Sequence, residues 1–324
     1  MTSLPASPTF ISPRARPARV RLRAGIERLI EGALFLLTLL SIATTVGIIV
    51  ILVRETWGFF TMRGADGQIL VPISDFLGDS LWSPLLSDPP RFGVTSLVCG
   101  TLLVTAIAAV FALPLGLLTA VYLSEYAPPR VRGVVKSLLE ILAGIPTVVY
   151  GFFALTFITP NLLQPISSSF GTHSAMSAGI AVGIMILPIV SSLAEDALRA
   201  VPQSLRDGSL ALGSTKAETI LRVVIPAALS GIVASFLLAI TRAIGETMIV
   251  ALAAGGSVAQ LTLNPSAQVQ TMTAWMVQVF LGDAPAGGIE YQSSYAVAFT
   301  LFAFTFVMTW VGALILRRYR EVYE

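Results

Sequence analysis

The chain has 324 residues, of which 55% are hydrophobic and only 12% are charged, and its mean hydropathy is +0.83. A typical soluble domain is about 25% charged, so this composition excludes a soluble globular protein. Several uncharged runs exceed the roughly 20 residues that an α-helix needs to cross the hydrocarbon core of a bilayer. The sequence therefore predicts an all-α polytopic membrane protein.

The content of chemically reactive residues argues against an enzyme. A single cysteine, Cys99, rules out an intrachain disulfide framework, and a single histidine, His173, cannot build a metal site alone. The Gly-x-x-x-x-Gly-Lys-Ser/Thr pattern that cradles nucleotide phosphates is missing from the sequence. We therefore expect neither catalysis nor a bound cofactor in this chain.

The first part of the chain separates into a basic tail, one helix and a polar segment. Residues 1–28 are rich in proline and arginine and are predicted to be a disordered tail. Residues 29–54 contain an uncharged run longer than the 7–15-residue core of a signal peptide, which predicts a retained first transmembrane helix. Residues 55–91 carry too many charges for lipid and are predicted to be an external loop.

Residues 92–316 are predicted to be a membrane core with helices two to six. These helices are expected in residues 92–124, two in 141–194, 227–255 and 291–316. Residues 195–226 form a charged loop between helices four and five, and residues 317–324 form a C-terminal tail. Apolar residues between Val269 and Phe280 recur at helical spacing, which predicts a further short helix at the membrane interface.

The distribution of basic residues predicts the orientation. Six spans place both termini on one side, and 16 of the 20 lysines and arginines lie in the segments on that side. Basic residues concentrate in cytoplasmic loops. We therefore expect a multi-pass protein of the plasma (inner) membrane with both termini and the 195–226 loop in the cytoplasm.

The loop from Asp207 to Pro226 has the composition of a short helical element. Its apolar residues could give one buried face with the charged residues Lys216, Glu218 and Arg222 outward; the apolar set is Leu210, Leu212, Ala217, Ile220 and Leu221. Gly213 marks a turn between two helices or a close contact, and Pro226 is suited to open helix five. Without further information, a solvated connector explains the loop equally well.

The same loop resembles the E-A-A–x3–G–x9–I–x–L–P segment of permease subunits in binding-protein-dependent ABC importers. Gly213 and Pro226 match the glycine and the proline, whereas Gly208 and Ser209 replace the two alanines. The resemblance implies a type I ABC importer permease with six transmembrane helices and a cytoplasmic coupling helix that docks on an ATPase subunit. The candidate coupling residues that it implies are Asp207, Gly213, Lys216, Glu218, Arg222 and Pro226.

Two further segments narrow the resemblance. The sequences AGIPTVVYG (residues 143–151) and TRAIGETM (residues 241–248) are similar to segments of phosphate-specific transport permeases. The 54–91 segment, with Trp82, Ser83 and Pro84, resembles their C-type subunit. The resemblance implies a subunit of an ATP-driven phosphate importer, without a nucleic-acid partner. Its partners would be a second, A-type permease, an ATPase dimer that binds ATP and Mg²⁺, and an external phosphate-binding protein.

Arg242 and Glu246 are ionisable residues within predicted helix five, and such residues mark functional sites by default. A planar guanidinium suits an oxyanion such as phosphate, and residues four apart on one helix can pair. We hypothesise that Arg242 faces the pathway, neutralised by Glu246 when the pathway is empty and by phosphate when it is occupied. Pro146 and Thr147 are candidates for lining the same cavity. The alternative is an ion pair that only fixes helix packing.

Other functions stay open on the residues alone. A permease for another oxyanion or small solute would share every feature above. A secondary transporter is disfavoured because no internal repeat of paired broken helices is visible, and a membrane-embedded enzyme because no metal-ligand spacing or nucleophile–histidine arrangement is present.

Overall fold

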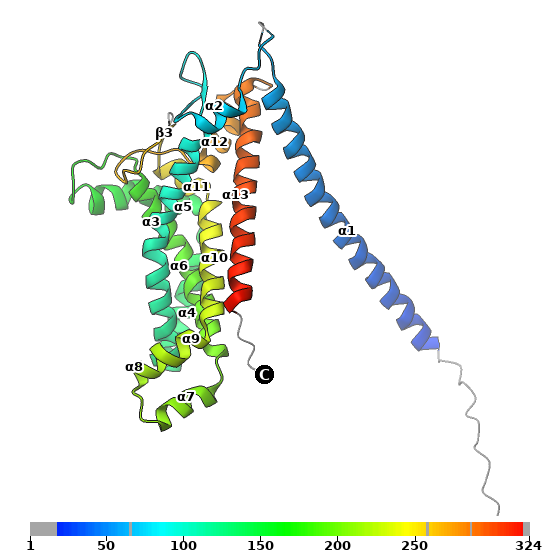
Figure 1. Cartoon of the computed structure of the whole chain (residues 1–324). Helices are drawn as coiled ribbons and strands as arrows, with labels where there is room; N and C mark the ends of the chain where they lie inside the picture. The colour runs from blue at the N-terminus through cyan, green and yellow to red at the C-terminus, as the bar shows by residue number, and fades with distance from the viewer. Residues whose placement is uncertain (1–17, 65–66, 257–258, 286, 320–324) are drawn as a thin grey trace, which may run out of the picture. The chain divides into compact units, whose positions relative to one another are not determined.

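The computed structural model describes residues 18–64, 67–256, 259–285 and 287–319 (Figure 1). The chain divides into one unit of residues Met1–Val53 and a second of residues Arg54–Glu324. Helix α1 spans Ala18–Thr61, so the first transmembrane helix was predicted, but with bounds that were too narrow. Residues 18–28, predicted as disordered, and residues 55–61, predicted as loop, are helical. The rest of the predicted tail lies outside the described residues.

The second unit is built around helices α3 (Val94–Val121) and α6 (Ala175–Ala200), which pack along their length. Small residues allow the close approach that membrane helices use. A Cβ atom at Gly179 would lie 2.5 Å from Ile107, and one at Gly116 would lie 2.6 Å from Val190. Helices α10 (Leu229–Ile244) and α13 (Ile289–Tyr319) complete the bundle (Figure 1).

Four described helices are long and apolar enough to cross a membrane, and two bent pairs raise the number to six. This number agrees with the six predicted helices. In the first pair, α4 (Pro129–Ala143) is bent by 90° from the segment formed by α5 (Thr147–Phe153) and η2 (Ala154–Leu163). In the second pair, the segment Lys216–Ala227 is bent by 69° from α10.

Helix five was predicted as one continuous helix from residue 227 to residue 255, and that prediction was wrong. The chain bends at Ala228, and α10 ends at Ile244 before the short helix α11 (Met248–Ala253). Pro226 does not open the membrane helix, because it lies in α9 (Ile225–Ala227), ahead of the bend. Broken helices are thus present, so their absence no longer argues against a secondary transporter.

Helix three was predicted to start at residue 141, but a helix already begins at Pro129. Helix α4 is amphipathic and contains no buried residue. Its basic residues Arg130, Arg132 and Lys136 lower the local hydropathy, which is why the segment was predicted to be a connection. Beyond the break, Gly151 of α5 lies directly on α11, since a Cβ atom there would be 3.2 Å from the Cα of Ile249.

The predicted external loop is a folded cap. It contains α2 (Ile73–Gly78), β1 (Leu81–Ser83) and β2 (Arg91–Phe92), and β3 (Ala259–Gln260) completes an antiparallel sheet of order β2-β1-β3. Trp82 is fully buried at its centre, with its ring 5.2 Å from that of Trp275 in an edge-to-face arrangement. Asp79 receives two hydrogen bonds from Arg91, of 2.6 and 2.8 Å, and these lower the pKa of the Asp79 carboxyl.

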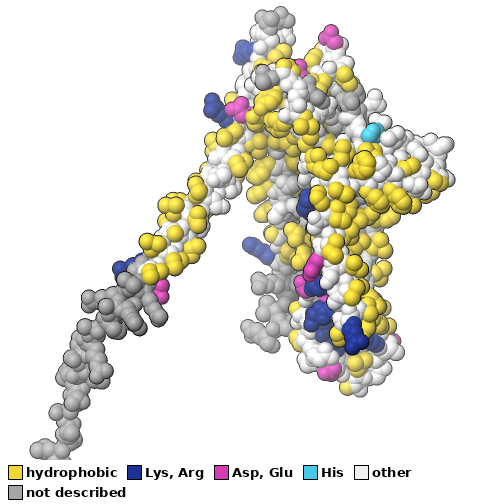
Figure 2. Space-filling model, turned by 180° about the vertical axis from the view of Figure 1, so that it is seen from behind, with side chains coloured by type: hydrophobic (Ala, Val, Ile, Leu, Met, Phe, Trp, Pro, Cys, Tyr) yellow, Lys and Arg dark blue, Asp and Glu magenta, His cyan; other side chains and the backbone are white. Residues whose placement is uncertain are grey.

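The predicted short helix after residue 268 is present as α12 (Met272–Gln278), which continues into η4 (Val279–Asp283). Met272, Trp275 and Val279 are buried in the cluster around Trp82. The opposite end of the bundle carries the α7–α8 loop (Figure 1). Figure 2 shows charged side chains gathered over that end and hydrophobic side chains over the middle of the bundle. This charge distribution fits a bundle whose middle lies in lipid.

Candidate functional site

Arg242 and Glu246 lie where α10 ends. Gly245 is the C-cap residue, with φ −85° and ψ 3°, and Glu246 follows it outside the helix. The Nη1 atom of Arg242 is 3.1 Å from Oε2 of Glu246. The predicted pairing is therefore present, although the two residues do not share one continuous helix.

The carboxylate of Glu246 is held from several sides. Its Oε1 atom accepts the backbone N–H groups of Met248 at 3.0 Å and Ile249 at 3.3 Å. These belong to the first turn of α11, whose N–H groups have no partner within the helix, and a negative charge is favourable there. The Glu246 carbonyl also accepts the hydroxyl of Thr273 at 2.7 Å. Nothing in the sequence indicated that Thr273 belongs to the site, because it lies 27 residues from Glu246 along the chain.

The two side chains differ in burial. Glu246 is 2% exposed and Arg242 is 46% exposed. Within the described part of the chain, the guanidinium of Arg242 has no acceptor other than Glu246. Its remaining N–H groups can therefore donate to an oxyanion in the planar geometry that suits phosphate.

Pro146 and Thr147 lie at the other helix break, where Pro146 is the exposed N-cap residue of α5 and Thr147 its first residue. The described residues show no hydrogen bond between either of them and the Arg242–Glu246 pair. The Tyr150 hydroxyl spans the break by donating to the carbonyl of Leu142 at 2.6 Å. A place for Pro146 and Thr147 in the pathway stays a prediction.

The predicted coupling loop consists of α7 (Gln203–Ala211), a turn at Gly213 and α8 (Lys216–Thr219), which continues into η3 (Ile220–Val224). Gly213 has φ +89°, and a Cβ atom there would meet nothing within 4 Å. Of the two interpretations of Gly213, the turn is therefore correct, because the left-handed conformation favours glycine. Asp207 accepts a 3.0 Å hydrogen bond from Gln203 on the same helix.

Glu218 forms a capping box with Thr215 at the start of α8. Its Oε2 atom accepts the backbone N–H of Thr215 at 2.8 Å and the Thr215 hydroxyl at 2.9 Å. These hydrogen bonds lower the pKa of the Glu218 carboxyl. Glu218 therefore has a local structural role that the sequence analysis did not assign to it.

The prediction of one buried apolar face on this loop was wrong. Ile220 is buried, but Leu212 is 89% exposed and Leu221 is 66% exposed. Lys216, expected to point outward, donates to the Glu125 carbonyl oxygen instead. Arg222 is exposed and has no ion-pair partner among the residues that the structure covers. The loop thus directs Lys216 toward its own chain and leaves Leu212 and Leu221 uncovered.

Comparison with known proteins agrees with this architecture. The chain is 34% identical over 269 residues to a Bacillus subtilis protein named probable ABC transporter permease protein YqgH, covering 83% of this chain and 84% of that protein. It is 38% identical to phosphate transport system permease protein PstA 1 of Mycobacterium tuberculosis, covering 64% and 66% of the two chains. It is 30% identical to PstC of Xylella fastidiosa, covering 75% and 78%. The relatives thus include both subunit types.

Solved structures share the fold. A bacterial alginate ABC transporter in complex with an alginate-bound periplasmic protein matches with a TM-score of 0.62 at 16% identity, covering 92% of this chain and 98% of that chain. An inward-facing methionine ABC transporter matches with a TM-score of 0.55 at 20% identity, covering 73% and 100%. Residues 112–321 match the model of the binding-protein-dependent transport system inner membrane component. The chain therefore belongs to this family, the membrane-spanning permease subunits of ABC importers.

Proposed function

We propose that this chain is one permease subunit of an ATP-driven importer for inorganic phosphate and forms half of the translocation pathway. The exposed guanidinium of Arg242 beside the buried carboxylate of Glu246 carries the proposal. Relatives at 30–38% identity are named phosphate transport permeases. An arginine within a membrane span costs roughly 2.5–3.5 kcal/mol to insert, and binding of an anionic substrate would offset that cost.

The geometry suggests how the pair can exchange partners. The carboxylate of Glu246 keeps two protein donors besides Arg242, the backbone N–H groups of Met248 and Ile249, and the backbone carbonyl of Glu246 accepts the hydroxyl of Thr273. Its carboxylate therefore stays solvated by the protein when the guanidinium turns to phosphate. Arg242 is the mobile partner, because its side chain is nearly half exposed. Pro146 and Thr147 are proposed to line the pathway at the second helix break.

We place the α7–α8 loop in the cytoplasm, together with both termini, on the distribution of basic residues. The exposed leucines Leu212 and Leu221 would enter an apolar groove of an ATPase subunit, since exposed apolar side chains at a protein surface mark interaction sites. Asp207, Glu218, Arg222 and Pro226 would lie at that contact. ATP and Mg²⁺ would be bound by the ATPase dimer, so that this chain itself is not catalytic.

The remaining partners follow from the same class of transporter. A second homologous permease would supply the other half of the pathway, and an external phosphate-binding protein would deliver the substrate to the cap around Trp82. We assign the chain to the C-type of phosphate permease because of its folded segment between helix α1 and helix α3.

The test is uptake of labelled phosphate into vesicles that hold the complete complex, with ATP inside and the binding protein outside. We expect uptake that requires ATP and that an excess of sulfate does not inhibit. Sulfate uptake without phosphate uptake would assign the chain to another oxyanion. Uptake that persists without ATP in a proton gradient would contradict the proposed class of transporter.

A further inference from the structure

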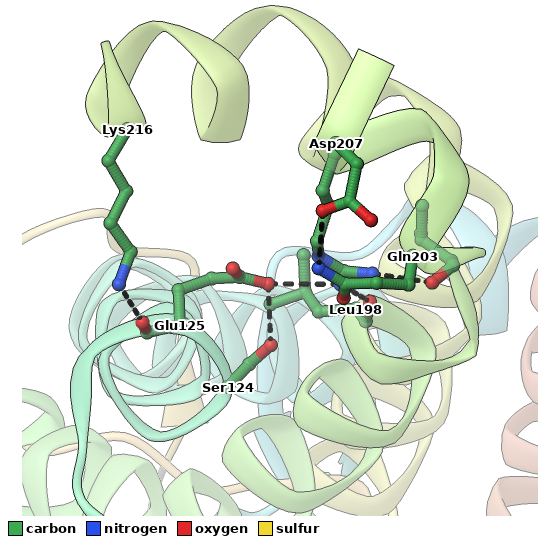
Figure 3. A network of polar contacts seen from close by, with 8 residues as sticks. Ser124, Glu125, Leu198, Gln203, Asp207 and Lys216 are labelled. Atoms are coloured by element: carbon green, nitrogen blue, oxygen red, sulfur yellow. Dashed lines mark hydrogen bonds and ion pairs between the residues drawn. The ribbon is translucent and has the colours of Figure 1, made fainter. Parts of the chain in front are cut away.

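Both short helices of the α7–α8 loop contact the same residue of another helix, Glu125. Glu125 lies in η1 (Tyr122–Tyr126), the last turn of the helix that α3 begins. Arg206 from α7 and Lys216 from α8 both bind it, one through its carboxylate and one through its carbonyl oxygen (Figure 3). Both short helices of the loop therefore contact the end of α3 through the same residue.

Arg206 joins three elements. Its Nη2 atom is 3.0 Å from Oε1 of Glu125 and 2.7 Å from the carbonyl oxygen of Leu198, and its Nη1 atom is 2.5 Å from that of Val201. The two carbonyls belong to the C-terminal end of α6, where backbone acceptors have no partner within the helix. Both side chains of the ion pair are nearly buried, with 13% of Arg206 and 10% of Glu125 exposed. Solvent therefore screens this pair only weakly.

The contact on the α8 side is similarly specific. The Nζ atom of Lys216 lies 4.6 Å from the ring centre of Tyr126 while it donates to the Glu125 carbonyl. The hydroxyl of Ser124 donates to Oε1 of Glu125 at 3.0 Å and orients the carboxylate toward Arg206. Arg206 of α7 and Lys216 of α8 thus both bind η1.

The apolar part of this attachment is small. Helix α7 has no fully buried residue, and its Leu205 packs partly buried on the apolar cluster at the ends of α3 and α6. A pocket of about 590 Å³ lies between α7, α8 and η1. Its lining includes Glu125, Arg206 and Lys216 themselves. Besides the chain connection to α6 and the packing of Leu205, these polar contacts join α7 directly to the end of α3.

The covalent route from α8 to α10 is bent. The segment Lys216–Ala227 meets α10 at 69°, so a push on the loop can pivot at Ala228 instead of moving α10 along its axis. Helices α3 and α6 pack closely along their length, as the close approaches at Gly116 and Gly179 show. Motion delivered to the ends of both helices would move them as one body.

We infer that Glu125 and Arg206 are positioning residues for energy coupling: they lock the α7–α8 loop to the ends of α3 and α6, so that a partner ATPase moves these helices together with α10. The inference rests on the proposed function, since it requires an ATPase that acts on this loop. It adds to that function a second, non-covalent route by which the loop acts on the bundle.

The test is the number of phosphate ions transported per ATP hydrolysed by the complete complex in vesicles. Glu125→Gln keeps the shape of the side chain but removes its charge, and we expect it to lower this ratio severalfold while ATP hydrolysis continues. Arg206→Gln removes the same ion pair together with the hydrogen bonds to Leu198 and Val201, so we expect a loss at least as large. The double variant should lose no more than Arg206→Gln alone, because both substitutions break the shared ion pair. The control is Asp196→Asn, which neutralises a carboxylate at the same end of the bundle that is 60% exposed.

A distance measurement separates coupling from a general loss of structure. In a Cys99→Ala background, which removes the single cysteine, spin labels at the exposed positions Ser204 and Tyr122 report the separation of α7 from the end of α3. In the native complex, we expect the distance between the two labels to be the same in the resting and ATP-bound states. In Glu125→Gln, we expect this distance to differ between the two states. If Glu125→Gln fails to assemble, Glu125→Asp replaces it, and we expect an intermediate ratio.

An unchanged ratio in an active Glu125→Gln or Glu125→Asp complex would overturn the inference. A distance that changes in the native complex as much as in the variant would also overturn it. Failure of the native complex to transport phosphate with ATP would instead contradict the proposed function, so the two failures are distinguishable.

Discussion

The carboxylate of Glu246 is almost completely buried, whereas the guanidinium-bearing side chain of Arg242, 3.1 Å away, is 46% exposed. Glu246 is fixed by the first turn of α11 and by Thr273, while Arg242 has no second protein acceptor among the described residues. An ion pair that served packing alone would bury both partners. The asymmetry instead favours an arginine that can leave its carboxylate for a substrate anion.

Glu246→Gln tests this exchange of partners. Glutamine keeps the Oε1 acceptor for Met248 and Ile249 but removes the charge that competes with phosphate for Arg242. We expect a lower KM for phosphate and a lower turnover, because the anion is bound more tightly and released more slowly. Initial uptake rates over a range of phosphate concentrations measure both, with Glu140→Gln, an exposed carboxylate of α4, as the control. A higher KM would contradict the competition.

Gly213→Val tests the turn between α7 and α8. A side chain at φ +89° costs roughly 1–2 kcal/mol. An added Cβ atom would meet nothing within 4 Å, so backbone strain is the main effect of the substitution. We expect ATP-driven uptake to be lost while the protein still inserts into the membrane. Gly208→Ala is the matched control, since Gly208 is helical and its Cβ would also meet nothing within 4 Å. Equal activity of both variants would show that the turn is dispensable.

The capping box predicts a pH dependence of the loop. Hydrogen bonds from Thr215 hold the pKa of Glu218 below its ordinary value of 4.5. The cap therefore stabilises α8 fully above that pH, and the stabilisation is lost as the pH falls through the lowered pKa. We expect amide protection in α8 to decrease in this acid range, as measured by hydrogen exchange. Thr215→Ala should remove most of the pH dependence and lower the stability of α8 by about 1 kcal/mol at neutral pH. A Thr215→Ala variant that keeps the pH dependence would refute its assignment to the capping box.

The contacts of Glu195 indicate that this residue holds α4 against α6. This carboxylate of α6 is 1% exposed, contacts Arg132 and lies 3.8 Å from Lys136 of α4. Because α4 contributes no buried residue, we expect Glu195→Gln to release it, at a cost of roughly 1.5–3 kcal/mol. A lower Tm and faster labelling of a cysteine at position 139, which is partly covered by α6, would report the release. Asp196→Asn removes only an exposed ion pair with Lys136, of 3.7 Å, and should have a much smaller effect on both. Unchanged labelling of position 139 in Glu195→Gln would contradict the role.

The apolar runs made the number of spans predictable, but not their interruptions. The hydropathy of residues 227–255 is continuous across Ala228, and near Gly245 it is interrupted only by Arg242 and Glu246. Glycine occurs within continuous membrane helices as well, so the sequence did not separate one helix from a bent and broken one. Helix α4 was missed for a different reason. Its basic residues lower the mean hydropathy of the segment, so a hydropathy criterion does not detect this amphipathic helix. The cap was missed because Trp82 pairs across the sheet with Ala259, a contact between distant parts of the chain.

The site was predictable in its residue types and less so in its geometry. The four-residue spacing of Arg242 and Glu246 was enough to predict that they pair, but only the structure shows that Glu246 is the fixed partner. In the loop, helical periodicity predicted a buried face, whereas Leu212 and Leu221 are exposed. Periodicity cannot tell whether an apolar face is covered by the same chain or by another one.

The most direct test of the account is phosphate uptake by Arg242 variants in the complete complex, at matched amounts in the membrane. Loss of hydrogen bonds to a charged ligand costs roughly 1.5–3 kcal/mol, so we expect Arg242→Ala to reduce kcat/KM at least about tenfold. Arg242→Lys, which keeps the charge but not the planar fork, should fall between Arg242→Ala and the native protein. Full ATP-driven uptake by Arg242→Ala would contradict the account.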